Sequence, residues 1–193
     1  MIKNFSNLIV DIETGSEIEA FEAAKNIACN KLSKAEFTKL SKIVTTGLEV
    51  HNKEAATYAI SWTENRSSVL SVLIDILGTL ENHERVRGQA AEGIGIISPS
   101  RKFKLRMAAE EILLKSLKDS SPTVRFWSCY AVGQIKLKRA IETLEKLKDN
   151  DNAVCPGWWY ISEEADDAIE WINDRNGKER IPLNQRKNTE PNL

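Results

Sequence analysis

A group of aromatic and acidic residues stands near the end of the sequence, in the stretch VCPGWWYISEEADD. Trp158, Trp159 and Tyr160 follow a Pro-Gly turn, and tryptophan and tyrosine are frequent anchors of protein–protein contacts. Glu163 and Glu164 come shortly after them and would add charge selectivity to such a contact. These five residues form one candidate partner-binding site.

The same aromatic turn also has a purely structural interpretation. Successive side chains of an extended segment diverge, so Trp158 and Trp159 cannot both point inward. We expect one of them to pack with Trp171 and Ile172 and to cover the apolar end of a helical stack. The other, or Tyr160, stays near the surface, and a cap and a contact site can coexist.

A second candidate site is basic. Lys102 and Arg106, in the segment RKFKLR, share one face at the start of a helix, and Glu110 lies one turn further on as a salt-bridge partner. Lys138 and Arg139 occupy the corresponding start about one structural unit later. Together they would form a positive stripe that receives an acidic partner or phosphates. The alternative is an ordinary solvated face.

Catalytic and metal-binding chemistry has little support in the sequence. His51 and His83 stand in polar surroundings, and no serine, histidine and aspartate follow a triad-like spacing. The cysteines form no CxxC pair and provide no zinc spacing with so few histidines. The acids from Glu163 to Glu170 could hold a cation, but acids in a first helical turn also stabilise the helix dipole without one. The sequence favours a non-catalytic protein with no cofactor and no metal.

Composition is typical of a soluble globular chain of one domain. The sequence has 193 residues, of which 41% are hydrophobic and 28% charged. Its 27 Lys+Arg and 28 Asp+Glu nearly balance, whereas a dedicated nucleic-acid binder usually carries a basic excess. No apolar run approaches the roughly 20 residues of a membrane span, and the first residues do not resemble a signal peptide. A cytoplasmic protein without a membrane partner is the expectation.

Helices must position these candidate residues. Glycine and proline are scarce, and no segment alternates with period two, so strands are not expected. Ser16 and Ser33, each followed three residues later by glutamate, predict N-terminal capping boxes. Ser121 before Pro122 predicts another helix start. One helical face is marked by apolar or small residues at Val124, Trp127, Ser128, Ala131, Val132 and Ile135.

A repeated pattern divides the chain into units. A small residue followed four positions later by a β-branched one occurs at Ala23/Ile27, Ala56/Ile60, Ala90/Ile94, Ser128/Val132 and Ala165/Ile169. Successive copies start roughly 35 residues apart, a period typical of helical solenoids. An ordinary helix bundle can give similar spacings. The two best copies favour the solenoid, because they also align Val86-Arg87 with Val124-Arg125 and Gly95 with Gly133.

The segment SPTVRFWSCYAVGQIKLKRAIETLEKL resembles a HEAT-like repeat of the short bacterial, PBS-lyase type. The matching positions are Pro122, Val124-Arg125, Val132-Gly133 and Ala140-Ile141 with Leu144, whereas Ser120-Ser121 stands where the family usually has an acidic residue. The resemblance is firm over about residues 83–149. It implies an all-α fold, an α-solenoid of about five HEAT-like helix pairs over residues 1–173 with an atypical C-terminal cap.

The resemblance also implies roles for single residues. In such repeats the matched arginines, Arg87 and Arg125, are expected to bond carbonyls or carboxylates at the turns between repeats, with Asp119 and Asp149 as candidate partners. Residues 174–193 are polar and are expected to be a disordered tail.

The function implied by this resemblance is protein–protein interaction without catalysis, as an adaptor, an assembly factor or an inhibitor of the immunity-protein type. The alternative is a DNA-binding protein related to the HEAT-like alkylpurine DNA glycosylases, which hold the duplex on a basic concave face and use aromatic and acidic residues at the lesion. Trp158, Trp159 and the nearby acids fit that comparison, and the balanced net charge opposes it. The repeat type alone also suggests a bilin-lyase-like chaperone for a tetrapyrrole.

Overall fold

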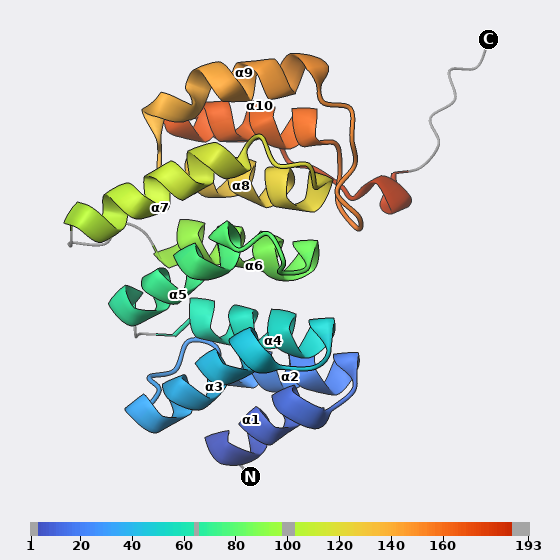
Figure 1. The fold of residues 1–193 in the computed structure, drawn as a ribbon. Helices are drawn as coiled ribbons and strands as arrows, with labels where there is room; N and C mark the ends of the chain where they lie inside the picture. Colours follow the sequence, from blue (N-terminus) through green and yellow to red (C-terminus); the bar gives the residue numbers. More distant parts are fainter. Residues whose placement is uncertain (1–3, 64–65, 98–102, 187–193) are drawn as a thin grey trace.

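Helices make up nearly all of the described chain (Figure 1). The structure is a computed structural model and describes residues 4–63, 66–97 and 103–186. The helices are α1 (Phe5–Thr14), α2 (Glu17–Ile27), α3 (Lys34–Thr46), α4 (Val50–Ser61), α5 (Arg66–Gly78), α6 (Glu84–Ile97), α7 (Phe103–Ser116), α8 (Pro122–Gln134), α9 (Ile141–Asn150) and α10 (Ile161–Ile172), with short 3-10 turns η1 (Lys138–Ala140) and η2 (Leu183–Gln185). Within those ranges the β-pairing is one isolated bridge between Val154 and Tyr160. The predicted all-α fold is confirmed.

The predicted helix starts are also confirmed. Ser16 and Ser33 each form a capping box, in which the serine N–H donates to the glutamate three residues later at 2.9 and 2.8 Å. Ser121 caps α8, with Pro122 in the first turn. Helix α1 precedes the first predicted unit and buries Leu8, Ile9 and Ile12. Every helix in the described ranges is too short or too polar to cross a bilayer.

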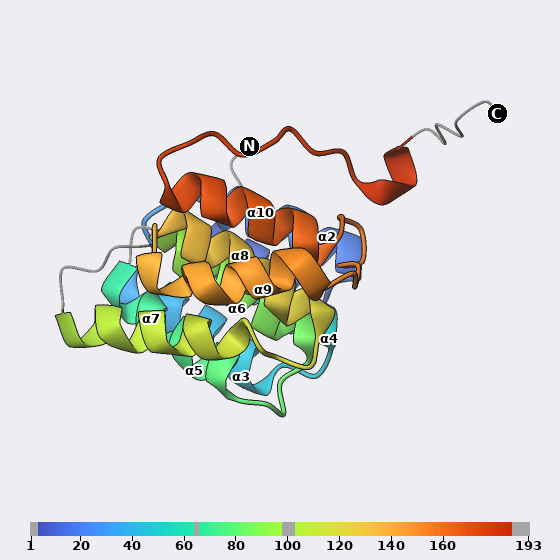
Figure 2. The same ribbon diagram turned by 90° about the horizontal axis from the view of Figure 1, so that it is seen from above.

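The helices form two layers that follow the chain from one end of the molecule to the other (Figures 1 and 2). The even-numbered helices α2, α4, α6, α8 and α10 pack against one another in that order. Each odd-numbered helix packs on the even-numbered helix that follows it, so five helix pairs succeed one another. This sequential stacking confirms the solenoid. We call the row of even-numbered helices the inner layer and the row of odd-numbered helices the outer layer.

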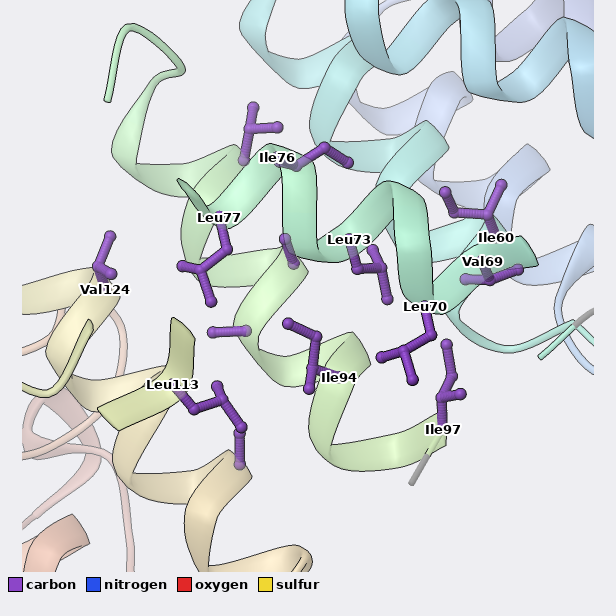
Figure 3. Close-up of a cluster of buried hydrophobic side chains, with 14 of the residues drawn as sticks. Ile60, Val69, Leu70, Leu73, Ile76, Leu77, Ile94, Ile97, Leu113 and Val124 are labelled. Atoms are coloured by element: carbon purple, nitrogen blue, oxygen red, sulfur yellow. The ribbon is translucent and has the colours of Figure 1, made fainter. Parts of the chain in front are cut away.

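The apolar core runs continuously between the layers. Figure 3 shows Leu73 and Leu77 of α5 facing Ile94 of α6, and all three side chains are buried. Glycine allows the inner layer to pack closely. A Cβ atom on Gly95 would lie 2.8 Å from the Cα of Ala131 in α8. The aligned small residues of the sequence pattern therefore mark helix-to-helix contacts.

Two arginines tie consecutive repeats together, as expected. Arg87 donates to the Asp119 carboxylate and, at 3.3 Å, to the Leu77 carbonyl oxygen. Arg125 donates to the Asp119 carbonyl oxygen at 2.8 Å and to the Asp151 carboxylate at 2.7 Å. The expectation that Asp149 would be the carboxylate partner is wrong. Asp149 is exposed on α9, whereas Asp151 caps the end of that helix and lies beside the turn.

The polar segment after α10 makes specific contacts with that helix over residues 174–186. Residues 174–186 return along α10 (Figure 2), and the side chain of Arg180 is only 10% exposed. Arg180 pairs with Asp167 and, at 3.1 Å, with Glu163, and the N–H of Leu183 donates to the Trp158 carbonyl oxygen at 3.0 Å. Carboxylates of α10 thus hold a segment with few apolar residues against the helix. Residues 187–193 lie outside the described ranges.

Candidate functional site

The two adjacent tryptophans separate into an inner and an outer side chain. Trp159 is half-buried, packs on Phe126 with ring centroids 5.7 Å apart, and donates its ring N–H to Glu164 at 2.9 Å. Trp158 is 38% exposed and packs edge-on against Trp127 at 5.2 Å. Trp171, expected beside the inner tryptophan, lies instead against Tyr130 of α8. Tyr160 is exposed at the start of α10.

The acids that follow the aromatic turn are engaged within the chain. Glu163 pairs with Arg180 and Arg186, and Asp166 pairs with Lys148 and Lys178. Hydrogen bonds from these two lysines lower the pKa of Asp166 to about 2. In the described part of the chain, no group of three or more His, Cys, Asp or Glu side chains is arranged to hold a metal. The acidic cluster therefore acts as the anchor of the C-terminal segment.

Glu164 differs from its neighbours because it is buried in the cap. Burial raises its pKa to about 8, and the hydrogen bond from Trp159 opposes the shift. Its second oxygen, Oε1, has no hydrogen-bond partner among the described residues. Glu164 is therefore a group of the protein interior, so no partner can reach it without opening the cap.

This burial makes stability depend on pH. A carboxyl whose folded pKa lies above its unfolded value of about 4.5 stabilises the fold most at low pH, and this stabilisation is lost progressively as the pH rises from about 4.5 to about 8. In the wild type, we expect Glu164 to lower the free energy of unfolding by about 2–3 kcal/mol between about pH 5 and about pH 7. We expect this decrease to be absent in Glu164→Gln, because glutamine does not ionise. Urea denaturation across that range measures it. The exposed Glu142→Gln should keep the wild-type profile, and parallel profiles for Glu164→Gln and wild type would contradict the expectation.

The basic candidate residues lie on the outer layer. Lys138 and Arg139 are exposed in η1, and Arg106 is exposed near the start of α7. Arg139 pairs with Glu111 at 2.6 Å, and Arg106 lies 3.6 Å from Glu110. Acids of α7 thus offset much of this charge, so these residues do not form an uninterrupted positive stripe. Lys102 lies outside the described ranges.

The inner layer carries a hollow of about 480 Å³ that spans several repeats. Four aromatic side chains line it, Phe21 of α2, Tyr58 of α4, Trp127 of α8 and Trp158 of the turn before α10. Of the residues predicted from sequence, only Trp158 belongs to this lining. We call this surface the aromatic hollow.

The charged lining of the aromatic hollow is mainly acidic, with Glu54, Glu84 and Glu92 against Arg85. Arg85 is already paired, with Glu54 at 2.6 Å and with Glu17 beyond the lining. Burial raises the pKa of Glu54, although Arg85 opposes this. The hollow therefore has a negative character.

Glu92 lies between two repeats within the hollow. It accepts a hydrogen bond from the Gln89 amide, and within the described ranges no lysine or arginine lies at ion-pair distance from it. Burial raises its pKa, and its charge in turn contributes to raising the pKa values of Tyr58 in α4 and Tyr130 in α8. Glu92 is thus a half-buried carboxyl flanked by aromatic rings from the repeats on either side.

Comparison with known proteins agrees with this geometry. Residues 70–156 match the family model described as HEAT repeats. The predicted resemblance to HEAT repeats is confirmed over this segment. The matched segment extends from α5 to the turn after α9 and includes both repeat-linking arginines. The sequence has no match among curated proteins.

Solved structures similar to this chain include designed solenoids. One is a designed armadillo repeat protein in complex with the peptide (KR)4, with a TM-score of 0.56 and 22% identity over 88% of this chain and 82% of that chain. Another is a computationally designed armadillo repeat protein for modular peptide recognition, with a TM-score of 0.55 and 24% identity over the same shares. At these identities the likeness concerns the fold.

Proposed function

We propose that this HEAT-repeat protein is a non-catalytic protein-binding module and that its partner docks on the aromatic hollow. The observation that carries the proposal is the lining, since Phe21, Tyr58, Trp127 and Trp158 come from separate elements and are all partly accessible on one side of the stack. Aromatic side chains held by a rigid scaffold are the usual anchors of protein interfaces.

The form of the surface suits an elongated ligand. Stacked helix pairs produce extended binding surfaces, and the aromatic hollow runs from α2 to the turn before α10. The similar designed armadillo proteins are described as a peptide complex and as proteins for peptide recognition, which supports a protein segment as the ligand. In the cell such a module would act as an adaptor, an assembly factor or an inhibitor. The exposed Tyr160 and the basic residues of the outer layer would at most contribute to the edges of the contact.

The DNA-binding alternative is less well supported. A duplex is a polyanion and is held by lysine and arginine, whereas the aromatic hollow is lined by three glutamates and by one arginine that is already paired. The basic candidate residues Arg106 and Arg139 lie on the outer layer, beside Glu110 and Glu111.

The test uses the purified full chain as bait in an extract of the source cell, followed by titration of the identified partner. We expect Trp158→Ala and Phe21→Ala to weaken binding at least about tenfold, as for hot-spot aromatics. The control is Leu48→Ala, because Leu48 is an apolar side chain that is 95% exposed away from the hollow. Wild-type affinity in both aromatic variants, with unchanged circular dichroism, would refute the proposal.

A further inference from the structure

The chemistry of the partner can be specified further, on the basis of the proposed function. We propose that the aromatic hollow receives a lysine or arginine side chain from an extended basic segment of the partner, and that Glu92 is the counter-ion of that cation.

The first argument is charge. Arg85 is neutralised by Glu54, and Glu84 is exposed to solvent and accepts a hydrogen bond from the Ser121 hydroxyl at 2.6 Å. Glu92 has only the neutral amide of Gln89. A half-buried carboxylate without a cation is partly desolvated at a cost in free energy, and a cation that arrives with the partner would offset this cost in the complex. The surface is therefore complementary to positive charge.

The second argument is the aromatic wall on each side of Glu92. Tyr58 of α4 stands on one side, and Trp127 of α8 stands on the other with Trp158 edge-on to it at 5.2 Å. Ammonium and guanidinium groups bind over the faces of such rings, and tryptophan is the most favourable ring. Arginine also stacks on aromatic planes through its guanidinium group. The hollow thus combines a counter-ion with the rings that cations prefer.

The third argument is the length of the surface. The lining reaches across four inner helices, α2, α4, α6 and α8, and the turn before α10. An extended chain advances about 3.3 Å per residue, with alternate side chains facing one side. A segment with a basic residue at every second position would therefore present cations to Glu84 and Glu92. An acidic or phosphorylated segment would meet like charges at both positions.

The probe for the test is an octapeptide of alternating arginine and serine. Matched peptides carry glutamine or glutamate in place of arginine, and binding is followed through tryptophan fluorescence and calorimetry at about 0.15 M salt. We expect the arginine peptide to bind at least about tenfold more tightly than the glutamine peptide, and the glutamate peptide not to bind. Glu92→Gln keeps the shape of the side chain and the Gln89 contact but should reduce the preference for arginine about tenfold. Glu145→Gln, at an exposed position on α9, should leave it unchanged.

The outcomes separate this inference from the proposed function. If the glutamine or glutamate peptide bound as tightly as the arginine peptide, and did so through Trp158, the inference of a basic partner would be wrong. The proposal that a protein binds at the hollow would stand. An undiminished arginine preference in Glu92→Gln would overturn the role of Glu92. Failure of all three peptides to bind up to millimolar concentration would overturn the inference even if the bait experiment yields a Trp158-dependent partner.

Discussion

Arg87→Ala is expected to lower the free energy of unfolding by about 3–5 kcal/mol, because it leaves the carboxylate of Asp119 without its main partner in a poorly hydrated site. The two side chains are only 7% and 9% exposed. Arg87 also donates to the Leu77 carbonyl oxygen, so one substitution loosens the end of α5 and the turn before α8 together. Urea denaturation at neutral pH measures the loss.

Two controls sharpen this experiment. Lys146→Ala removes an exposed ion pair with Glu142 and should leave the denaturation midpoint unchanged. The double substitution Arg87→Met with Asp119→Leu should recover much of the loss, because an apolar pair of similar volume does not bury an unpaired charge. A midpoint for Arg87→Ala equal to that of wild type would show that the pair does not hold the repeats together.

The Arg87 effect should also depend on pH in a defined direction. Burial disfavours the Asp119 carboxylate, but hydrogen bonds from Arg87 and from the Ser121 N–H outweigh this and lower its pKa below 3.8. A carboxyl with a lowered folded pKa stabilises the fold above its unfolded pKa, and the contribution is lost as the pH falls. The difference between Arg87→Ala and wild type should therefore shrink in acid.

The second large effect is expected at Gly95, where two inner helices come closest. Gly95→Ala places a Cβ atom 2.8 Å from the Cα of Ala131, so α6 and α8 must separate. Overpacking costs about 1–3 kcal/mol, and the better helix propensity of alanine returns about 1 kcal/mol of it. Gly95→Val adds two further methyl groups beyond the Cβ atom and should lower the free energy of unfolding by about 3 kcal/mol or more. Thermal unfolding reports each kcal/mol as a shift of about 2–4 °C.

Gly78 provides the matched control. Gly78 is also a helical glycine, at the end of α5, but a Cβ atom there would meet only Ile112 Cδ1, at an ordinary contact distance of 3.5 Å. Gly78→Ala should therefore raise the free energy of unfolding by up to about 1 kcal/mol. Equal effects of alanine at Gly78 and Gly95 would mean that close helix approach is not the reason for glycine at the second position.

The fold was predictable because its signals are local. Serine caps, helical spacing of apolar residues and the recurring Val-Arg and glycine positions each lie within one or two repeats, and the structure confirms them. The contacts of Arg87 and Arg125 at the turns between repeats were predictable. The choice between Asp149 and Asp151 as the partner of Arg125 was not, because it depended on where α9 ends. The pairing of Arg180 with Asp167 was not predictable, because the two residues meet only once the chain has reversed after α10.

The aromatic hollow was harder to predict, because its lining comes from several repeats that are distant in sequence. Trp158 stood out beside another tryptophan, whereas Phe21 and Glu92 each look ordinary in their own helix. A repeat-by-repeat alignment contained a usable signal. The residue two positions after the small residue is Tyr58, Glu92 and Tyr130 in three consecutive inner helices, and all three face the same side.

The return of the chain along α10 has a practical consequence for what can be attached to this protein. Because the Leu183 N–H is bonded to the Trp158 carbonyl oxygen, the polypeptide leaves the described region beside the rim where the ligand would sit. The amino end lies at the far pole of the stack (Figure 1). A fluorophore, tag or tethered enzyme fused behind Arg186 would therefore report on, or obstruct, a ligand that arrives at the Trp158 end of the hollow.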